Sequence, residues 1–116
     1  MFPLYSPGDH LRVDRGPYWH HGIYVGDGWM IHLSGLFGGK DAAEVQMCRF
    51  EDFVGTSGLA AVEVVEYGHA DAVAVVFERA RSQLGRVGYN LAQDNCEHFA
   101  RWCKTGAVVS LKHPLI

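Results

Sequence analysis

"HHGIYVGDGWMIHLSG", residues 20–35, places two runs of β-prone apolar residues on either side of Gly26-Asp27-Gly28. Two short apolar runs joined by glycine and aspartate are typical of a β-hairpin. We therefore predict a pair of antiparallel strands here. The register of this pair decides which side chains share a face of the sheet.

The turn leaves two registers open. A two-residue turn at Asp27-Gly28 sets Ile23 opposite His32. A three-residue loop over residues 26–28, whose last glycine is left-handed, sets Gly22 opposite His32 instead. A slip of one residue between these registers sends every side chain of a strand to the other face.

The apolar pattern favours the three-residue loop. In that register Val25 faces Trp29, and His20 and His32 become diagonal neighbours on one face, within reach of each other. In the other register His20 lies on the opposite face. The favoured register also gathers one apolar set on a single side of the hairpin: Ile23, Val25, Trp29 and Ile31.

Other stretches predict further strands. One is expected around residues 11–13, after a turn at Pro7-Gly8-Asp9. "EVQMCRFEDFV", residues 44–54, and "LAAVEVVEY", residues 59–67, are also interpreted as strands. The glycine-rich "GLFGGKD", residues 35–41, is interpreted as a loop that either flanks a substrate groove or simply connects two elements.

Two helices are expected in the C-terminal half. "DAVAVVFERARSQLG", residues 71–85, has apolar residues at helical spacing, with its aspartate as N-cap and its glycine at the C-terminal cap. "NCEHFARWCKTG", residues 95–106, forms the second helix, capped by Asp94 or Asn95. The predicted fold class is therefore α+β: an antiparallel β-sheet with C-terminal helices, in one domain over residues 1–116.

The composition excludes several classes of protein. With 116 residues, 48% apolar and 20% charged, the chain has the profile of a globular domain with a modest core. A net charge of -3 argues against a nucleic-acid partner. No apolar run of about 20 residues and no signal peptide are evident. Three cysteines, an odd number, argue against a disulfide framework. We expect a soluble, cytoplasmic protein without a transmembrane anchor.

Cys96 is the candidate nucleophile. At the first turn of a helix, unpaired backbone N–H groups and the helix dipole stabilise a thiolate, and the same N–H groups could hold an oxyanion. The alternative is a packed thiol at the mouth of the helix. Cys48 and Cys103 are expected to be packed thiols. Cys103 lies seven residues beyond Cys96 on the same helix face, two turns deeper, where a core position is natural.

His20 and His32 are the candidate base and its orienting partner. A thiol nucleophile needs a base, and a second group that holds the base in position. Tyr18, just before His20, either offers its hydroxyl to an oxyanion or packs under the loop. For the other histidines we expect exposed or boundary positions at His10, His69, His98 and His113, and a structural or exposed role at His21. The Cys and His spacings match no zinc pattern, and no metal or cofactor is expected.

Three motifs are similar to those of a known family. "PGDHLRV", "YWHHGIYVGDGWMIHLSG" and "NCEHFARW" resemble the lecithin:retinol acyltransferase-like family, closest to its small phospholipase A/acyltransferases related to the HRAS-like suppressors. The resemblance covers about residues 7–106. It implies a circularly permuted papain-like (NlpC-type) α+β fold. In the resemblance, His20 matches the base, His32 the second histidine, Cys96 the nucleophile and Tyr18 a residue linked to oxyanion stabilisation.

The resemblance implies thiol-dependent acyltransferase or phospholipase A-type hydrolase activity. An acyl chain would pass from a glycerophospholipid to Cys96 and then to an acceptor, with transient contact at a membrane surface. The sequence departs from the family where it ends at "LKHPLI" without an apolar helix, in a shorter stretch between hairpin and helix, and at His21, where an aromatic residue is common. Two alternatives stay open: an NlpC-type cysteine peptidase or amidase, and a non-enzymatic viral-type interaction module.

Overall fold

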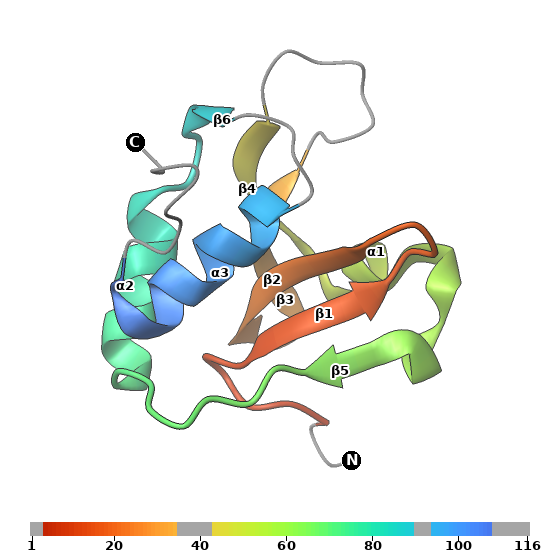
Figure 1. Cartoon of the computed structure of the whole chain (residues 1–116), viewed down its shortest axis with the longest axis horizontal. Helices are drawn as coiled ribbons and strands as arrows, with labels where there is room; N and C mark the ends of the chain where they lie inside the picture. Colours follow the sequence, from red (N-terminus) through yellow and green to blue (C-terminus); the bar gives the residue numbers. More distant parts are fainter. Residues whose placement is uncertain (1–3, 35–42, 90–93, 108–116) are drawn as a thin grey trace.

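The computed structural model describes residues 4–34, 43–89 and 94–107. Within them, a six-stranded antiparallel sheet has the strand order β5-β1-β2-β3-β4-β6 (Figure 1). The strands are β1 (His10–Asp14), β2 (Trp19–Gly26), β3 (Trp29–Ser34), β4 (Ala43–Arg49), β5 (Val62–Val64) and β6 (Val87–Tyr89). The helices are α1 (Phe50–Val54), α2 (Val73–Ser82) and α3 (Asp94–Thr105). The predicted α+β class, an antiparallel sheet with C-terminal helices, is confirmed.

The hairpin of β2 and β3 has the register that the apolar pattern predicted. Gly22 lies opposite His32, and Ile23 lies opposite Ile31. Because side chains alternate along a strand, His20 lies two residues before Gly22 on the same face as His32. The hairpin therefore brings the two predicted site histidines together.

The turn that produces this register differs from the prediction. Gly26 pairs with Trp29, where Val25 was expected to do so. Asp27-Gly28 is a two-residue turn in which both residues have positive φ, 54° and 84°, as in a type I′ turn. Val25 is the extra residue of a bulge between Tyr24 and Gly26. The bulge restores the register that a three-residue loop would have given.

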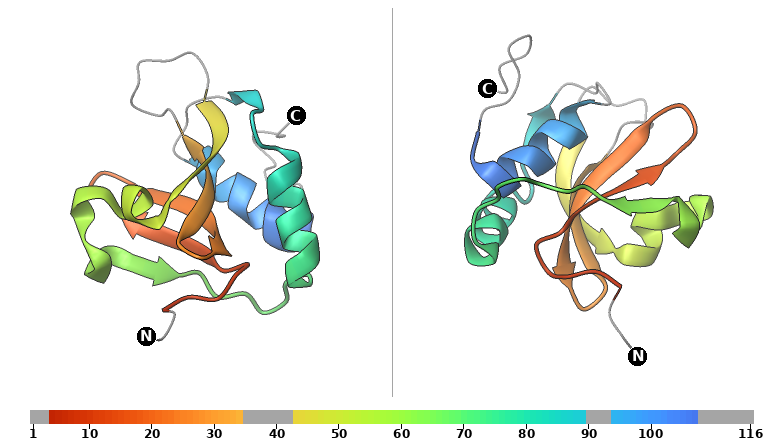
Figure 2. Two further views of the ribbon diagram at one scale, coloured as in Figure 1. Left: turned by 180° about the vertical axis from the view of Figure 1, so that it is seen from behind. Right: turned by 60° about the horizontal axis from the view of Figure 1, so that its bottom comes forward.

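Both faces of the sheet are covered. Helices α2 and α3 lie against one face, and α1 lies against the other (Figure 2). The core on the α3 face contains Ile23, Ile31, Leu33, Ala43, Val45, Val76, Ala80, Cys96, Phe99, Ala100 and Cys103. The core on the α1 face contains Leu11, Val13, Met30, Phe53 and Val54. Strand β2 lies between the two cores, so its successive side chains point alternately towards the α3 face and the α1 face.

The segments interpreted as long strands are shorter in the structure. β4 ends at Arg49, and the next five residues form α1, which buries Phe53 and Val54 against the sheet. The N–H of Phe50 donates to the carbonyl of Gly28, which turns the chain away from the strand direction. β5 keeps only three residues of the interpreted strand. The glycine-rich loop over residues 35–41 lies outside the described residues.

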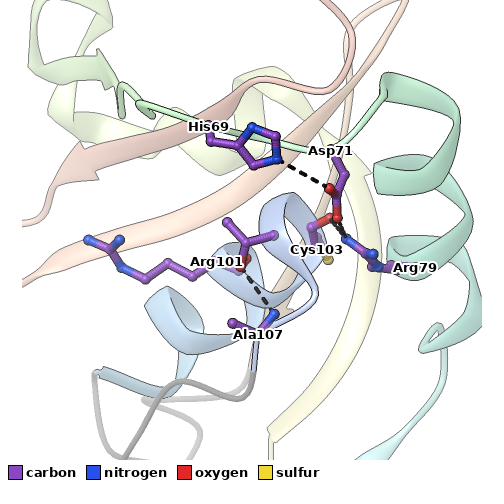
Figure 3. Close-up of polar contacts among 7 residues, drawn as sticks. His69, Asp71, Arg79, Arg101, Cys103 and Ala107 are labelled. Atoms are coloured by element: carbon purple, nitrogen blue, oxygen red, sulfur yellow. Dashed lines mark hydrogen bonds and ion pairs between the residues drawn. The ribbon is translucent and has the colours of Figure 1, made fainter.

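Asp71 does not cap α2 as predicted. The N-cap is Ala72, without a side-chain hydrogen bond. The carboxylate of Asp71 instead forms a 2.8 Å ion pair with Arg79, in the second turn of the helix, and lies 3.9 Å from His69 (Figure 3). Its backbone N–H donates to the carbonyl of Lys104. Asp71 therefore ties the segment before α2 to both C-terminal helices.

The second predicted helix is confirmed as α3, with Gly106 directly after its end at φ 75°. α2 ends at Ser82 with Gln83 as its C-cap, so the prediction of Gly85 as the cap is wrong: Gly85, at φ 86°, lies two residues beyond it. Within residues 4–34, 43–89 and 94–107, no helix combines the length and apolar character that a membrane span requires.

Candidate active site

His20 and His32 form a hydrogen-bonded pair on the α1 face of the sheet. Nε2 of His20 lies 2.8 Å from Nδ1 of His32. His20 is buried, with 5% of its surface exposed, and His32 is partly buried. The contact follows from the hairpin register, because it joins diagonal neighbours of two adjacent strands.

Phe53 closes this pair from the helix side. Its ring centroid lies 5.3 Å from the ring of His20 and 6.1 Å from the ring of His32. Gly22 leaves the space that this packing needs. A Cβ at Gly22 would lie 3.0 Å from Phe53 Cε1 and 3.2 Å from the Cβ of His32. The two imidazoles are therefore held between the strands and α1.

Both imidazoles are neutral at pH 7. Burial, with smaller contributions from His32 and the Arg15 guanidinium, lowers the pKa of His20 to about 3. Burial and Arg15 lower the pKa of His32 to about 4. Nδ1 of His20 is buried and has no hydrogen-bond partner among the described residues. This nitrogen is available to take a proton from a third group.

Cys96 lies at the start of α3 and is fully buried. Its thiol donates to the carbonyl of Trp19 over 3.9 Å. Burial raises the pKa of Cys96 to about 11, although the backbone N–H groups of His21, Glu97 and Cys96 itself act in the opposite direction. The expected N–H groups are therefore present, but burial outweighs them, and the thiol is protonated at pH 7.

The backbone around His20 meets Cys96. Trp19 and His21, the neighbours of His20 on both sides, are the residues whose backbone groups contact the sulfur. The pairing of β2 with β3 extends only to Gly22, whereas its pairing with β1 extends to Trp19. Within the described residues, the edge of β2 that faces β3 is therefore unpaired from Trp19 to His21, and the first turn of α3 contacts the backbone there.

Tyr18 is half-buried just before this segment. Burial raises its pKa; Arg15 acts against that effect, and the negative charge that Cys96 carries when ionised adds to it. The phenol therefore lies within electrostatic range of the sulfur. Of the four predicted site residues, the structure pairs His20 with His32, and it places Cys96 against the backbone of Trp19 and His21, the chain neighbours of His20.

Arg15 belongs to this group and was not predicted. Its guanidinium donates to the carbonyl of Phe53 over 2.6 Å, and its charge lowers the pKa of His20, His32 and Tyr18. Nε of Arg15 is buried without a partner among the described residues. Its position before the Gly16-Pro17 turn carries no signal for this role, because the contact with α1 joins residues 38 positions apart.

The prediction that His10 is exposed is wrong. His10 is fully buried, because β5 and the segment after it cover β1. Nδ1 of His10 lies 2.7 Å from the hydroxyl of Tyr67, and Nε2 lies 2.8 Å from Nδ1 of His21. His21 points to the α3 face and has a structural role, one of the two expected for it. Among the remaining histidines, His69 is exposed and His98 partly buried, as expected, and His113 lies outside the described residues.

The other two cysteines are packed thiols, as predicted. Cys103 is fully buried in the core of the α3 face, and burial raises its pKa to about 12. Cys48 is partly buried against the core of the α1 face, and burial raises its pKa to about 11. In the part of the chain that the structure describes, no cluster of three or more His, Cys, Asp or Glu side chains could hold a metal ion.

Comparisons with known proteins identify one family. The family model "Lecithin retinol acyltransferase" matches residues 3–109. The human protein "Phospholipase A and acyltransferase 4" is 30% identical, over 87% of this chain and 70% of its own length. "Phospholipase A and acyltransferase 1" of Mus musculus is 29% identical, over 90% of this chain and 70% of its own length. "Lecithin retinol acyltransferase" of Rattus norvegicus is 28% identical, over 89% of this chain, which spans 55% of that protein.

Proposed function

The chain belongs to the lecithin retinol acyltransferase family, and on that premise we propose that it transfers or hydrolyses acyl groups through an acyl-thioester on Cys96, with His20 as the base. One observation carries the proposal. The strand segment whose backbone meets the Cys96 sulfur also holds His20, whose buried Nδ1 has no partner among the described residues while Nε2 is bound by His32.

The hydrogen bond to His32 sets the tautomer of His20. If Nε2–H of His20 donates to Nδ1 of His32, Nδ1 of His20 keeps a lone pair and can accept a proton. The opposite arrangement would leave a buried N–H on Nδ1 without an acceptor, which is rarer and costly. When His20 takes a proton, both of its nitrogens carry N–H, and the lone pair of His32 Nδ1 still accepts one of them. His32 is therefore the orienting residue.

The reaction begins from a neutral pair. Because the pKa of Cys96 lies at about 11 and that of His20 at about 3, a preformed thiolate–imidazolium pair is disfavoured in the free protein. Proton transfer from Cys96 Sγ to His20 Nδ1 must accompany attack of the sulfur on the acyl carbonyl carbon.

The acyl group then passes through two exchanges. The S–C bond forms, the carbonyl oxygen becomes an oxyanion, and the N–H groups at the start of α3 and the Tyr18 hydroxyl are the available donors. The oxyanion collapses, the ester C–O bond breaks, and His20 returns its proton to the departing alcohol oxygen. In the second exchange His20 takes a proton from water or another acceptor, which attacks the thioester carbon. The S–C bond then breaks, and His20 returns the proton to Cys96 Sγ.

The names of the relatives support a lipid ester as the donor. Phospholipase A and acyltransferase proteins and lecithin retinol acyltransferase share this family, so we propose a glycerophospholipid donor presented at a membrane surface. We also infer a circularly permuted papain-like arrangement. The order of the site residues supports it, since the proposed base in β2 precedes the nucleophile in α3.

A side-by-side substrate assay tests the proposed class. Phosphatidylcholine vesicles, an acyl-thioester and a peptide amide are offered to the wild-type chain and to Cys96→Ala. We expect fatty acid or transferred acyl product from the phospholipid, and none from Cys96→Ala. Cleavage of the peptide amide alone would contradict the lipid substrate and would favour a peptidase of the same thiol chemistry.

A further inference from the structure

A second hydrogen-bonded histidine pair lies on the opposite face of β2. His10 and His21 lie 2.8 Å apart between Nε2 and Nδ1, and the Tyr67 hydroxyl lies 2.7 Å from the other nitrogen of His10. His10 is fully buried, and only 6% of the surface of His21 is exposed. No step of the proposed reaction uses these side chains. They join β1, β2 and the segment after β5 into one polar chain.

The direction of this chain follows from its charges. Burial lowers the pKa of His10 to about 2 and that of His21 to about 4, so each ring carries one N–H at pH 7. The Glu97 carboxylate acts against burial on the pKa of His21. We assign the N–H of His21 to Nε2, so that its Nδ1 accepts from His10. His10 then donates Nε2–H to His21 and accepts the Tyr67 O–H. The cations that face the pair are Arg12, Arg101 and Lys104.

Tyr67 is a fixed end of the chain, because the segment that carries it is tied down on both sides. The N–H of Val65 donates to the carbonyl of His10 over 2.8 Å, and the N–H of Asp71 donates to the carbonyl of Lys104 over 2.8 Å. The Tyr67 ring also lies beside the charged groups of Arg101, at 5.9 Å, and Lys104, at 5.5 Å. The hydroxyl is thus held in place by contacts that do not depend on it.

The other end of the chain reaches the nucleophile. His21 presents its side chain to His10 and its backbone N–H to the sulfur of Cys96, whose thiol donates to the carbonyl of Trp19 over 3.9 Å. His21 therefore links the polar chain directly to the backbone that surrounds Cys96.

We propose that His10 and His21 are positioning residues for Cys96: with the Tyr67 hydroxyl, they hold the Trp19–His21 backbone against the first turn of α3 and keep the His21 N–H aimed at the sulfur. The inference rests on the proposed function only in taking Cys96 as the reactive thiol. A neutral polar chain suits this task, because its hydrogen bonds are directional where apolar packing would allow the strand to slide.

Alkylation of individual thiols tests this role. The full chain is treated with iodoacetamide at pH 8, and Cys96 and Cys103 are followed by peptide mass spectrometry. His21→Leu removes the acceptor for His10. We expect about tenfold slower alkylation of Cys96, equal to a rise of about 1 pH unit in its pKa, because the thiolate loses one N–H donor. Alkylation of Cys103 should not change.

Conservative variants sharpen the test. His21→Asn keeps an acceptor, Oδ1, near the place of Nδ1, and should alkylate closer to wild type than His21→Leu. Tyr67→Phe removes only the hydroxyl and should also slow the alkylation of Cys96, by a smaller factor than His21→Leu. Two matched controls should leave Cys96 unchanged: His69→Leu, on the same segment as Tyr67, and Tyr24→Phe, whose hydroxyl accepts the N–H of Gly28 in the hairpin.

Loss of packing would have the opposite sign. The inference is overturned if His21→Leu speeds the alkylation of both Cys96 and Cys103, or if Cys96 is alkylated at the wild-type rate. Tyr67→Phe decides the question by the same criterion if His21→Leu does not fold. Acyl-adduct formation from phosphatidylcholine is recorded on the same samples. A wild-type chain that never acylates would overturn the proposed function alone, whereas acylation with unchanged alkylation in the variants would overturn this inference alone.

Discussion

Nε2 of His20 lies 2.8 Å from Nδ1 of His32, across the two strands of the hairpin. This contact ties up one nitrogen of His20 and leaves the other buried, with no hydrogen-bond partner among the described residues. A buried basic nitrogen with one free lone pair is a costly feature unless a proton donor approaches it. The thiol of Cys96 is the donor that we propose.

His32 should contribute through the hydrogen bond that it accepts. His32→Ala is expected to lower the turnover of phospholipid by about 100-fold, because His20 loses the group that fixes its tautomer. His32→Asn, which can offer Oδ1 near the place of Nδ1, should retain more activity. Initial rates on phosphatidylcholine vesicles measure both. Equal activity of His32→Ala and wild type would remove His32 from the mechanism.

Arg15 should hold the two site histidines neutral. Arg15→Gln removes a positive charge, so the pKa values of His20 and His32 should rise from about 3 and about 4. NMR titration of the imidazole resonances below pH 7 should show protonation beginning at a higher pH than in the wild type. Arg49→Gln, a change at an exposed arginine stacked on Trp29, is the matched control. An unchanged onset in Arg15→Gln would contradict the electrostatic role.

The buried histidines should make folding sensitive to mild acid. Their folded pKa values lie below the unfolded value of about 6.5, so the unfolded chain binds more protons as the pH falls below that value. The free energy of unfolding should be at its full value above pH 6.5 and decrease towards pH 5, by up to about 1.4 kcal/mol per pH unit for each such histidine. The histidines concerned are His10, His20, His21 and His32.

Urea unfolding at several pH values between 7.5 and 5 measures this dependence, above the range in which most carboxylates titrate. A free energy of unfolding that stays constant over this range would contradict the neutral, buried state of the four histidines.

Cys96 should react slowly with iodoacetamide at neutral pH. Burial raises its pKa to about 11, so its alkylation rate should keep increasing up to pH 10 without a plateau near pH 6–7. Slow alkylation therefore does not by itself indicate a non-enzymatic interaction module. A pH-independent rate between pH 6 and 8 would show a preformed thiolate and contradict concerted proton transfer.

The sequence predicted the histidine pair because alternation along a strand is a local property. Only one register gathers Ile23 and Ile31 on a single side, and that register brings His20 to His32. The same pattern could not show the bulge at Val25, since a two-residue turn with a bulge and a three-residue loop give one register. Helix α3 was predicted with comparable success, from its apolar spacing and its glycine stop.

Contacts between segments far apart in the chain could not be predicted from the sequence. Arg15 acquires its role by reaching the carbonyl of Phe53, 38 positions away, and His10 is buried by the segment that carries Tyr67, 57 positions away. Neither pairing has a local pattern. From the sequence alone, a histidine beside a turn, such as His10, is expected to be exposed. Its burial becomes evident only when the pairing of β5 with β1 is known.

Mapping of an acyl adduct tests the nucleophile directly. The chain is incubated with phosphatidylcholine of defined acyl chains, quenched in acid, and analysed as intact protein and as peptides by mass spectrometry. Cys96→Ala, His20→Ala and Cys48→Ala are treated in parallel, the last as the control for a packed thiol. We expect one acyl group on Cys96 in the wild type and in Cys48→Ala, far less in His20→Ala, and none in Cys96→Ala. An adduct on Cys48 or Cys103, or an unmodified chain that still turns over phospholipid, would contradict the assignment of Cys96.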